Sequence, residues 1–295
     1  MTHITTPDVI QITPTRMDFQ FNNVPRHWVF DDAFSTHFLG TLSTLFPVGE
    51  RFFVDSVRQL REHAPDKAAQ KDISGFIGQE AMHSLEHVSL NNMLEAKGLP
   101  ALRAEKFTLG LLNLGRRMLS KRQQLAITVA LEHFTAIIAN RLLSDTTIMN
   151  GLAEEMRPVW MWHAIEETEH KAVAFDLYKS VPGNSYAERI VFQVFATVIL
   201  AAVVSAFQLQ FLYRDKSLFS PKTWAFGLNK LFGFNGVISG LIPEYLDYFK
   251  RDFHPWEHEN SALVAYWRDK LNAIATPVPM NGRARTQAAF VLAGN

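Results

Sequence analysis

The chain has 295 residues, 47% of them apolar, which is enough to bury a substantial core in one large domain or in a domain with an appended region. Lysine plus arginine and aspartate plus glutamate both number 29, so the formal net charge is zero and no basic field attracts nucleic acid as a partner. The sequence has no cysteine, which excludes disulfides, iron–sulfur clusters and thiol catalysis. Histidine and carboxylate side chains are therefore the expected ligands if the protein binds a metal.

The N-terminal residues 1–26 are rich in threonine and proline and have little periodicity. We interpret them as an extended arm that carries no chemistry. No apolar run follows a basic start here, so the segment does not have the pattern of a secretory signal. The sequence predicts a cytoplasmic protein, with association with the inner membrane as the alternative.

Helical patterning begins at about His27, with an apolar and aromatic stretch that runs to Phe46. Pro47 suits the first turn of a helix, because that position needs no backbone N–H donor. We therefore predict a kink or a new helix start at Pro47, followed by a helix that carries Glu50 and ends near His63.

Three more long helices are predicted in the first two thirds of the chain. One covers 65–97 and stops at Gly98, a second covers 120–144, and a third covers 148–179 and is closed by Pro182. No strand-like alternation of comparable length is visible, so the predicted fold class is all-α.

The segment 190–213 is an uncharged apolar run, IVFQVFATVILAAVVSAFQLQFLY. If helical, it is long enough to cross a bilayer core of about 30 Å, and it is equally compatible with a helix buried in an all-α protein. Residues 221–253 mix glycine, aromatic and lysine side chains, as in an interfacial amphipathic segment or a lid over a bundle. A membrane surface or a single span is thus one predicted partner.

These patterns divide the chain into four parts. We predict an arm at 1–26, a ferritin-like four-helix bundle at 27–183, a C-terminal helical region at 184–275 and a loosely ordered tail at 276–295.

The main functional signal is the recurrence of glutamate and histidine on four successive helices. A two-metal site in a four-helix bundle takes one Glu from each of two helices and a Glu-x-x-His unit from each of the other two. The sequence supplies this set in chain order as Glu50, Glu80 with His83, Glu132, and Glu167 with His170.

Helical spacing agrees with this assignment. Positions three apart lie about 60° apart around a helix, so Glu80 and His83 can face the same point. His87 lies about 20° from Glu80 around its helix, and His163 lies about 40° from Glu167, so each is a candidate seventh ligand.

A single Glu-x-x-His unit is common by chance and usually marks an exposed pair. Two such units together with Glu132, set in the apolar stretch LAITVALEHFTAIIA, are harder to explain without a cation, because an unpaired buried carboxylate costs several kcal/mol. Four residues fall off the ligand faces and are interpreted as partners of the ligands or as solvated groups: Glu86, Glu166, Glu169 and His133. Four histidines are predicted to be incidental: His27, His37, His254 and His258.

The chain resembles a bacterial family described as predicted metal-dependent hydrolases, through FPVGERFF around Glu50, IGQEAMHSLEH, and WHAIEETEHKAVAFD. This resemblance spans most of 20–270. The ligand order is similar to that of ferritin-like di-iron proteins. The spacing of His163, Glu167 and His170 is similar to that of di-iron arylamine N-oxygenases, which have an extra histidine ligand on the last bundle helix. This second resemblance favours His163 as the seventh ligand, while the long apolar segment departs from that group, so its substrate is not transferred.

The sequence thus predicts an enzyme with two metal ions, iron first and manganese as the alternative. The leading hypothesis is an oxidoreductase that uses O2 to oxidise an apolar small-molecule substrate. No flavin or nicotinamide fingerprint is visible, so an external electron donor is expected. The alternatives are a metal-dependent hydrolase that uses a metal-bound hydroxide, and a non-catalytic metal-binding or storage protein. A homodimer is compatible with each hypothesis.

Overall fold

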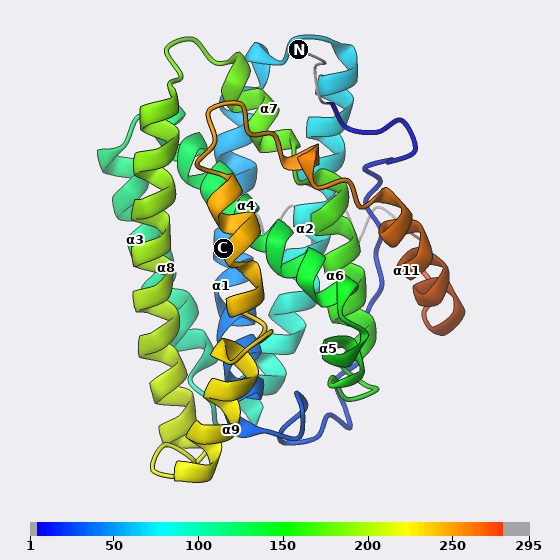
Figure 1. The fold of residues 1–295 in the computed structure, drawn as a ribbon, viewed down its shortest axis with the longest axis vertical. Coiled ribbons are helices and arrows are strands. Elements are labelled where there is room, and N and C mark those ends of the chain that lie inside the picture. The colour runs from blue at the N-terminus through cyan, green and yellow to red at the C-terminus, as the bar shows by residue number, and fades with distance from the viewer. Residues whose placement is uncertain (1–4, 280–295) are drawn as a thin grey trace.

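The computed structural model describes residues 5–279 and is all-α, which confirms the predicted fold class. Four helices form the centre of the molecule: α1 (Ala33–Arg58), α2 (Lys67–Ala96), α4 (Lys121–Ser144) and α6 (Arg157–His170). They lie lengthwise along the long axis, with α1 packed on α2 and α4 packed on α6 (Figure 1). Within residues 5–279 there is no β-strand, only an isolated bridge between Val29 and Leu152. The more specific ferritin-like assignment stays a prediction.

Capping residues place the ends of two central helices where the sequence predicts them. The Asp66 side chain accepts a hydrogen bond from the backbone N–H of Ala69 at the start of α2, and Gly98, just beyond its end, has a φ of +83°. At the start of α4, Ser120 and Gln123 form a reciprocal capping box.

Of the two alternatives predicted at Pro47, the new helix start was wrong, because α1 continues through this residue, while the kink stays a prediction. Proline inside a helix leaves the carbonyl four residues earlier without its usual donor. That carbonyl belongs to Ser43, and the side chain of Asn91 on α2 donates to it at 3.1 Å. A neighbouring helix thus supplies the hydrogen bond that Pro47 cannot make, and the helix is preserved.

The single helix predicted at 148–179 is instead three elements. α5 (Thr146–Asn150) ends at Gly151, α6 follows after an irregular connection, and α7 (Val173–Ser180) comes after a short turn. A Cβ at Gly151 would lie 2.1 Å from the Phe30 ring, so this aromatic packs directly against the backbone where the chain leaves α5. This tertiary contact is not visible in a local helical pattern.

One helix, α3 (Ala101–Met118), is missing from the predicted set. It packs on α1, and only Ala101 and Ala104 are buried, whereas several larger apolar residues face outward. The helix is nevertheless amphipathic, with Leu111 and Leu112 partly buried against the core, so its helical pattern was present in the sequence and was missed.

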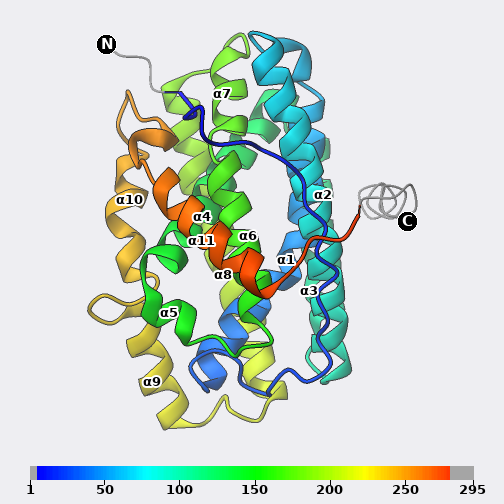
Figure 2. The same ribbon diagram turned by 90° about the vertical axis from the view of Figure 1, so that its right-hand side faces the viewer.

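The C-terminal half adds helices around the bundle. α8 (Tyr186–Arg214), which contains the apolar segment 190–213, packs on α1 and α4, and α11 (Ser261–Ile274) packs on α6 at the opposite side (Figures 1 and 2). Between them lie α9 (Pro221–Phe232) and α10 (Ile242–Asp247). Three short 3-10 helices complete the set, at Arg61–His63, Ser239–Leu241 and Pro255–Glu257. Of the predicted tail, residues 280–295 lie outside the described residues.

Candidate metal centre

All seven side chains predicted as ligands converge in the middle of the bundle. α1 supplies Glu50, α2 supplies Glu80 and His83, α4 supplies Glu132, and α6 supplies His163, Glu167 and His170. None is more than 5% exposed. Whether each one binds a metal stays a prediction, but the fold places them as that prediction requires.

Potential ligand atoms lie within 4.8 Å of one another in three overlapping groups. The groups are Glu50 with His83 and His163, Glu80 with Glu132 and His170, and Glu80 with His83 and Glu167. The first two groups share no residue, so they define two adjacent positions for a cation. The third group shares Glu80 with one of them and His83 with the other, and it adds Glu167, so all seven side chains belong to one connected cluster.

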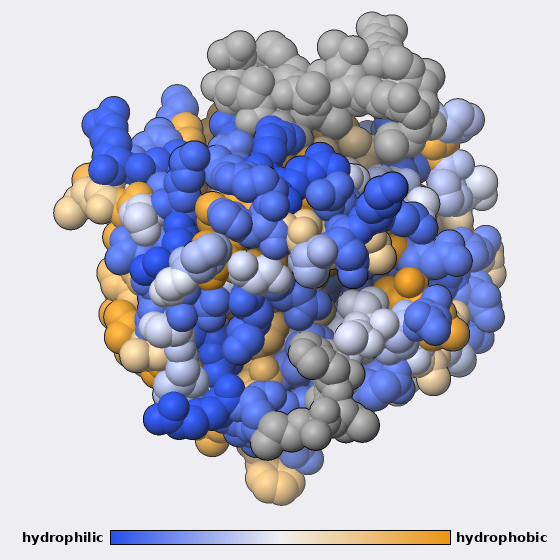
Figure 3. Space-filling model, turned by 90° about the horizontal axis from the view of Figure 1, so that it is seen from above, coloured by the Kyte–Doolittle hydropathy of each residue, from blue (hydrophilic) through white to orange (hydrophobic). Residues whose placement is uncertain are grey.

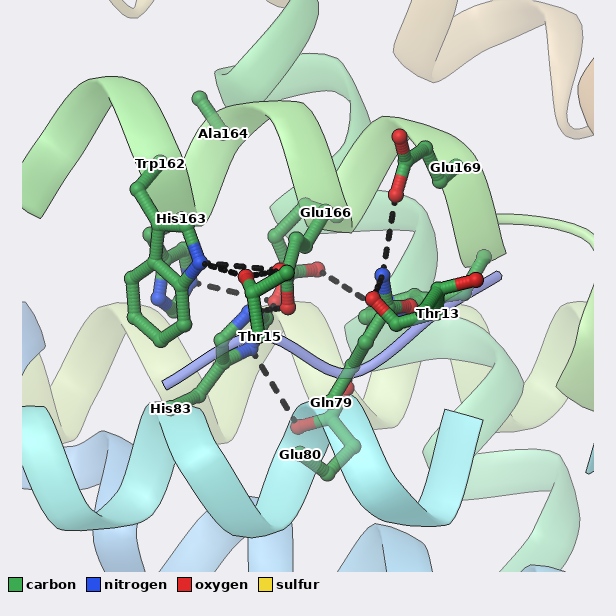
Figure 4. A network of polar contacts seen from close by, with 12 residues as sticks. Thr13, Thr15, Gln79, Glu80, His83, Trp162, His163, Ala164, Glu166 and Glu169 are labelled. Atoms are coloured by element: carbon green, nitrogen blue, oxygen red, sulfur yellow. Dashed lines mark hydrogen bonds and ion pairs between the residues drawn. The ribbon is translucent and has the colours of Figure 1, made fainter. Parts of the chain in front are cut away.

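His83 turns one ring nitrogen toward the cluster and the other away from it. Its Nδ1 lies 3.5 Å from a carboxylate oxygen of Glu167, while its Nε2 lies 3.3 Å from Glu166 on the outer side. The indole N–H of Trp162 donates to Glu166 at 2.9 Å, and the hydroxyl of Thr15 in the N-terminal arm donates to the same oxygen (Figure 4). Glu166 therefore orients His83, and the arm, predicted to carry no chemistry, supports Glu166.

His170 also has one ring nitrogen that faces the cluster and one that faces a protein partner, which in this case is neutral. Its Nε2 lies 3.1 Å from Glu80, and its Nδ1 lies 3.1 Å from the amide oxygen of Gln79. The amide nitrogen of Gln79 donates to Glu169 at 2.9 Å, and Glu169 is paired with Arg268 on α11 (Figure 4). This pairing fixes the Gln79 amide so that its oxygen accepts from His170, which leaves the Nε2 lone pair of His170 directed at the cluster.

His163 is held by a second histidine. Its Nε2 lies 3.1 Å from Glu167, and its Nδ1 lies 2.9 Å from Nε2 of His87. The Nδ1 of His87 lies 2.9 Å from the hydroxyl of Ser43, and that hydroxyl donates to the side-chain oxygen of Asn91 at 2.8 Å.

The direction of every hydrogen bond in this chain follows from Pro47. Because the Ser43 carbonyl lacks an amide donor, the Asn91 amide nitrogen binds it, and the Asn91 oxygen must then accept from the Ser43 hydroxyl. That hydroxyl in turn accepts from His87, so the other nitrogen of His87 accepts from His163. The nitrogen of His163 that faces the cluster is left with a free lone pair, as a metal ligand requires.

The hydrogen bonding of the cluster fits a bound cation, independently of the sequence motifs. Several buried side-chain atoms in it have no hydrogen-bond partner, namely both oxygens of Glu80 and of Glu132, one oxygen each of Glu50 and Glu167, and the inward nitrogens of the three histidines. Unpaired buried polar atoms are rare because each is costly. Nine such atoms aimed at one point fit two metal ions with a mixed carboxylate and imidazole shell.

The titration of the carboxylates points the same way. Burial, reinforced by repulsion from Glu80, raises the pKa of Glu50 and of Glu132 well above the usual value for a carboxylic acid. Burial also acts to raise the pKa of Glu167, but the surrounding histidines, His170 foremost, outweigh it and hold that pKa well below the usual value. Without a cation, the cluster can therefore hold only part of its negative charge.

An apolar cavity of about 510 Å³ leads to this cluster. Glu50 and His163 lie in its wall, and they are its only charged or titratable lining residues within the described part of the chain. The remaining wall is apolar or aromatic apart from two threonines, with contributions from α1, α3, α4, α6 and α8. One oxygen of Glu50 accepts from Ser84 at 2.8 Å, and the other is unpaired. The cavity suits an uncharged, apolar molecule.

The histidines predicted to be incidental are not all isolated. His27 and His37 both approach one carboxylate oxygen of Asp215, at 3.0 and 3.3 Å, and Arg26 donates to the other oxygen at 2.7 Å. These side chains could hold a metal by geometry, but the ion pair with Arg26 already balances the carboxylate. We interpret the group as an anchor that ties the N-terminal arm to the end of α8.

Other predicted partners of the ligands lie farther out. Glu86 accepts from the backbone N–H groups of Asp18 and Phe19 at 2.6 and 3.0 Å, so it fixes the arm. His133 is buried against Tyr248 and Phe253, and burial lowers its pKa to about 3. His254 and His258 pair with acidic side chains, Asp176 for the former and Glu244 and Asp247 for the latter.

The fold and the cluster define an all-α protein with buried groups of carboxylates and histidines that could hold metal. The chain matches a family model described as predicted metal-dependent hydrolase over residues 13–259, and it belongs to that family. This confirms the resemblance drawn from the three sequence motifs. No match to a curated protein or to a solved structure was found.

Proposed function

We propose that the chain is a two-metal enzyme that acts on an apolar substrate bound in the cavity beside Glu50 and His163. The observation that carries the proposal is the arrangement of the three histidines. Each has one ring nitrogen beside a protein partner, Glu166, Gln79 or His87, and the other facing buried carboxylates of the cluster. Iron is the metal we expect, with manganese as the alternative.

Hydrolysis is the reaction that the family description supports. When bound, two metals would supply a water of lowered pKa and would polarise the bond to be cleaved. The chain's own contributions are distinct from this. The cavity wall binds the apolar part of the substrate and excludes bulk water, and Glu50 and His163 place the cluster at the inner end of the cavity.

Oxidation by O2 is the second candidate, and two observations favour it. The ligand set is similar to that of di-iron N-oxygenases, including a histidine at the position of His163. In addition, the described lining of the cavity contains no arginine, lysine, asparagine or glutamine, so it lacks a cationic or amide side chain for the oxyanion of an ester or phosphate. Bound di-iron would supply O2 activation, and an external donor would supply the electrons. The chain would hold the substrate and exclude water.

Metal loading under controlled atmosphere tests the proposal and separates the two reactions. The stripped protein is reloaded with Fe(II) or Mn(II) without oxygen, the metal is counted per chain, and the protein is assayed for hydrolysis of apolar esters and for a change in visible absorption when O2 is admitted. Two metals per chain are expected. Ester turnover without an O2 response supports hydrolysis, whereas an oxygen-dependent band supports oxidation.

The variants Glu167→Ala and His83→Ala are each expected to lose metal, since each removes a side chain from the cluster. Glu62→Ala, which changes an exposed glutamate after α1, serves as the control. Retention of two metals by both cluster variants would contradict the ligand assignment.

A further inference from the structure

A broad apolar surface on one side of the molecule has no partner within the described residues. The sequence from Ile190 to Tyr213 in α8 contains no charged residue. Even so, only 28% of the 18-residue apolar stretch of this helix is buried. Val191 and Val198 are 62% and 60% exposed, and Leu209 and Tyr213 are also exposed. On α3, four apolar side chains are exposed as well, namely Leu102, Phe107, Leu114 and Met118.

The two helices share this surface. Phe107 of α3 and Phe207 of α8 meet edge to face, with ring centroids 5.6 Å apart, and α3 and α8 stand next to each other in Figure 1. We call this surface, formed by the outward side chains of α3 and α8, the α3–α8 face. By contrast, the end of the molecule seen in Figure 3 is mainly hydrophilic. Of the 21 large apolar side chains that are exposed in the described part of the chain, 11 lie on α3 and α8, and a surface of this kind marks an interaction site.

The α3–α8 face is not a transmembrane span. Two helices are long and apolar enough to cross a membrane, α4 and α8, but α4 is central and carries Glu132. The inner side of α8 packs along α1 and α4, with Gln193 and Gln208 buried and the Gln208 amide donating to the backbone carbonyl of Phe34 at 2.8 Å. A spanning α8 would carry the bundle and its charged surface into the bilayer, so only contact through the outer face is compatible with this fold.

The cavity that reaches the metal cluster opens through this same face. Four of its lining residues are strongly exposed, and they come from α3 and α8: Leu114, Met118, Phe195 and Ile199. Glu50 and His163 line the same cavity and are buried. A molecule that leaves the apolar face at its mouth can therefore reach the cluster along an apolar wall.

Exposed basic side chains lie at the C-terminal end of α3 and at the C-terminal end of α8. Arg117 and Lys121 are exposed beside Met118 in the sequence, and Arg214 and Lys216 are exposed just beyond Tyr213. Apolar side chains bordered by lysine and arginine complement a bilayer with anionic headgroups. A second copy of the chain fits less well, because docking through this face would cover the mouth with protein and close the route for substrate.

We infer that the α3–α8 face docks on a lipid bilayer and that the cavity takes its substrate, an apolar molecule dissolved in the bilayer, directly from it. The inference that this face docks on a bilayer depends only on the side chains of the surface, while the inferred substrate class depends on the proposed function. The chain lies on the membrane without crossing it, with the cavity mouth facing the acyl region.

Vesicle flotation of the full-length, metal-loaded protein tests this inference. The probe is a set of vesicles of phosphatidylcholine with or without phosphatidylglycerol. We expect the protein to float with the vesicles, more strongly when phosphatidylglycerol is present and less strongly at high salt. Val191→Glu with Val198→Glu should weaken the binding about tenfold or more, because carboxylates would enter the apolar contact. Ile274→Glu on α11, at a position 56% exposed on the other side, is the matched control and should bind as the parent does.

Three results distinguish the parts of this inference. No flotation, combined with a dimer in solution that Val191→Glu and Val198→Glu dissociate, would overturn it in favour of a second copy. Equal flotation of the double variant and the control would also overturn it. If vesicle binding behaves as expected while the parent holds no metal, the docking surface stands and the proposed function fails. Met118→Trp adds a direct readout, because its fluorescence should shift to the blue with vesicles if the mouth faces the acyl region.

Discussion

The three histidines of the cluster have chemically different partners, and this difference would affect any metals bound there. His83 faces a carboxylate, Glu166, whereas His170 faces the neutral amide of Gln79 and His163 faces a neutral imidazole. A carboxylate partner makes an imidazole a stronger electron donor than an amide does. Two metals bound as proposed would therefore have non-equivalent ligands, even though each Glu-x-x-His unit looks the same in the sequence.

His87 acts through His163, so we expect it to be a positioning residue for the metal site. His87→Leu removes the acceptor for the Nδ1–H of His163 and frees that ring to rotate, which should lower the affinity of one metal about 10- to 100-fold. A competition titration with a chelator measures this change. His63→Leu, at a half-buried position outside the cluster, is the control. If His87→Leu binds both metals as tightly as the control, the hydrogen-bond chain from Ser43 does not orient the site.

At the scale of elements, the sequence predicts the ligand-bearing helices well and their connections poorly. Glu80 and His83 fall on one helix with clear caps, so their shared face follows from spacing alone. The continuity of α1 through Pro47 depends on a donor from α2, and the break at Gly151 depends on the ring of Phe30. Such tertiary contacts have no local pattern, and the same is true of the pairing between His87 and His163.

The N-terminal arm is a second element whose role emerges only in three dimensions. Its composition predicts an extended segment, and nothing in its sequence indicates that Thr15 contacts Glu166 behind His83. The arm can lie this close because α2 has glycines beneath it. A Cβ at Gly75 would lie 2.3 Å from the backbone oxygen of Ile12, and one at Gly78 would lie 2.2 Å from the Pro14 ring.

Gly75→Ala is therefore expected to displace the arm. The change favours the helix itself by about 0.5–1 kcal/mol, but the contact with the Ile12 backbone cannot relax by a side-chain rotation alone. We expect lower thermal stability and faster proteolysis within the arm. The matched control is Gly110→Ala in α3, where a Cβ meets no atom within 4 Å. Its free energy of unfolding should rise by about 0.5–1 kcal/mol, because alanine favours a helix more than glycine does. A stability gain for both variants would show that the arm is not packed against α2.

For the whole molecule, the metal cluster joins the four central helices at one point while the outer helices shape access to it. The buried carboxylates are set in an otherwise apolar interior, and the chain has no net charge to offset them over long distances. The local cations that would balance Glu80, Glu132 and Glu167 are the metals themselves. Metal content should therefore control the stability of the bundle as well as its chemistry.

Removal of the metals should destabilise the whole bundle, and the side chains that held the metals should take up protons. Metal ions stabilise a fold that binds them by about 2.7 kcal/mol per site when free metal is about one hundred times the Kd, so stripped protein should unfold at lower temperature. Burial raises the pKa of Glu50 and Glu132. Burial opposes protonation of His83 and His170, but the carboxylates around them outweigh it and raise their pKa well above the usual value.

Because the pKa of each of these four groups is raised, they hold protons to higher pH in the stripped protein and must lose them to bind metal, so metal affinity should fall as the pH falls. Calorimetric metal titrations in two buffers of different ionisation enthalpy count the protons released, and unfolding scans with and without a chelator measure the stability. The same binding enthalpy in both buffers would mean that these side chains do not change protonation on binding. Unchanged unfolding after metal removal would mean that the cluster does not hold the four helices together.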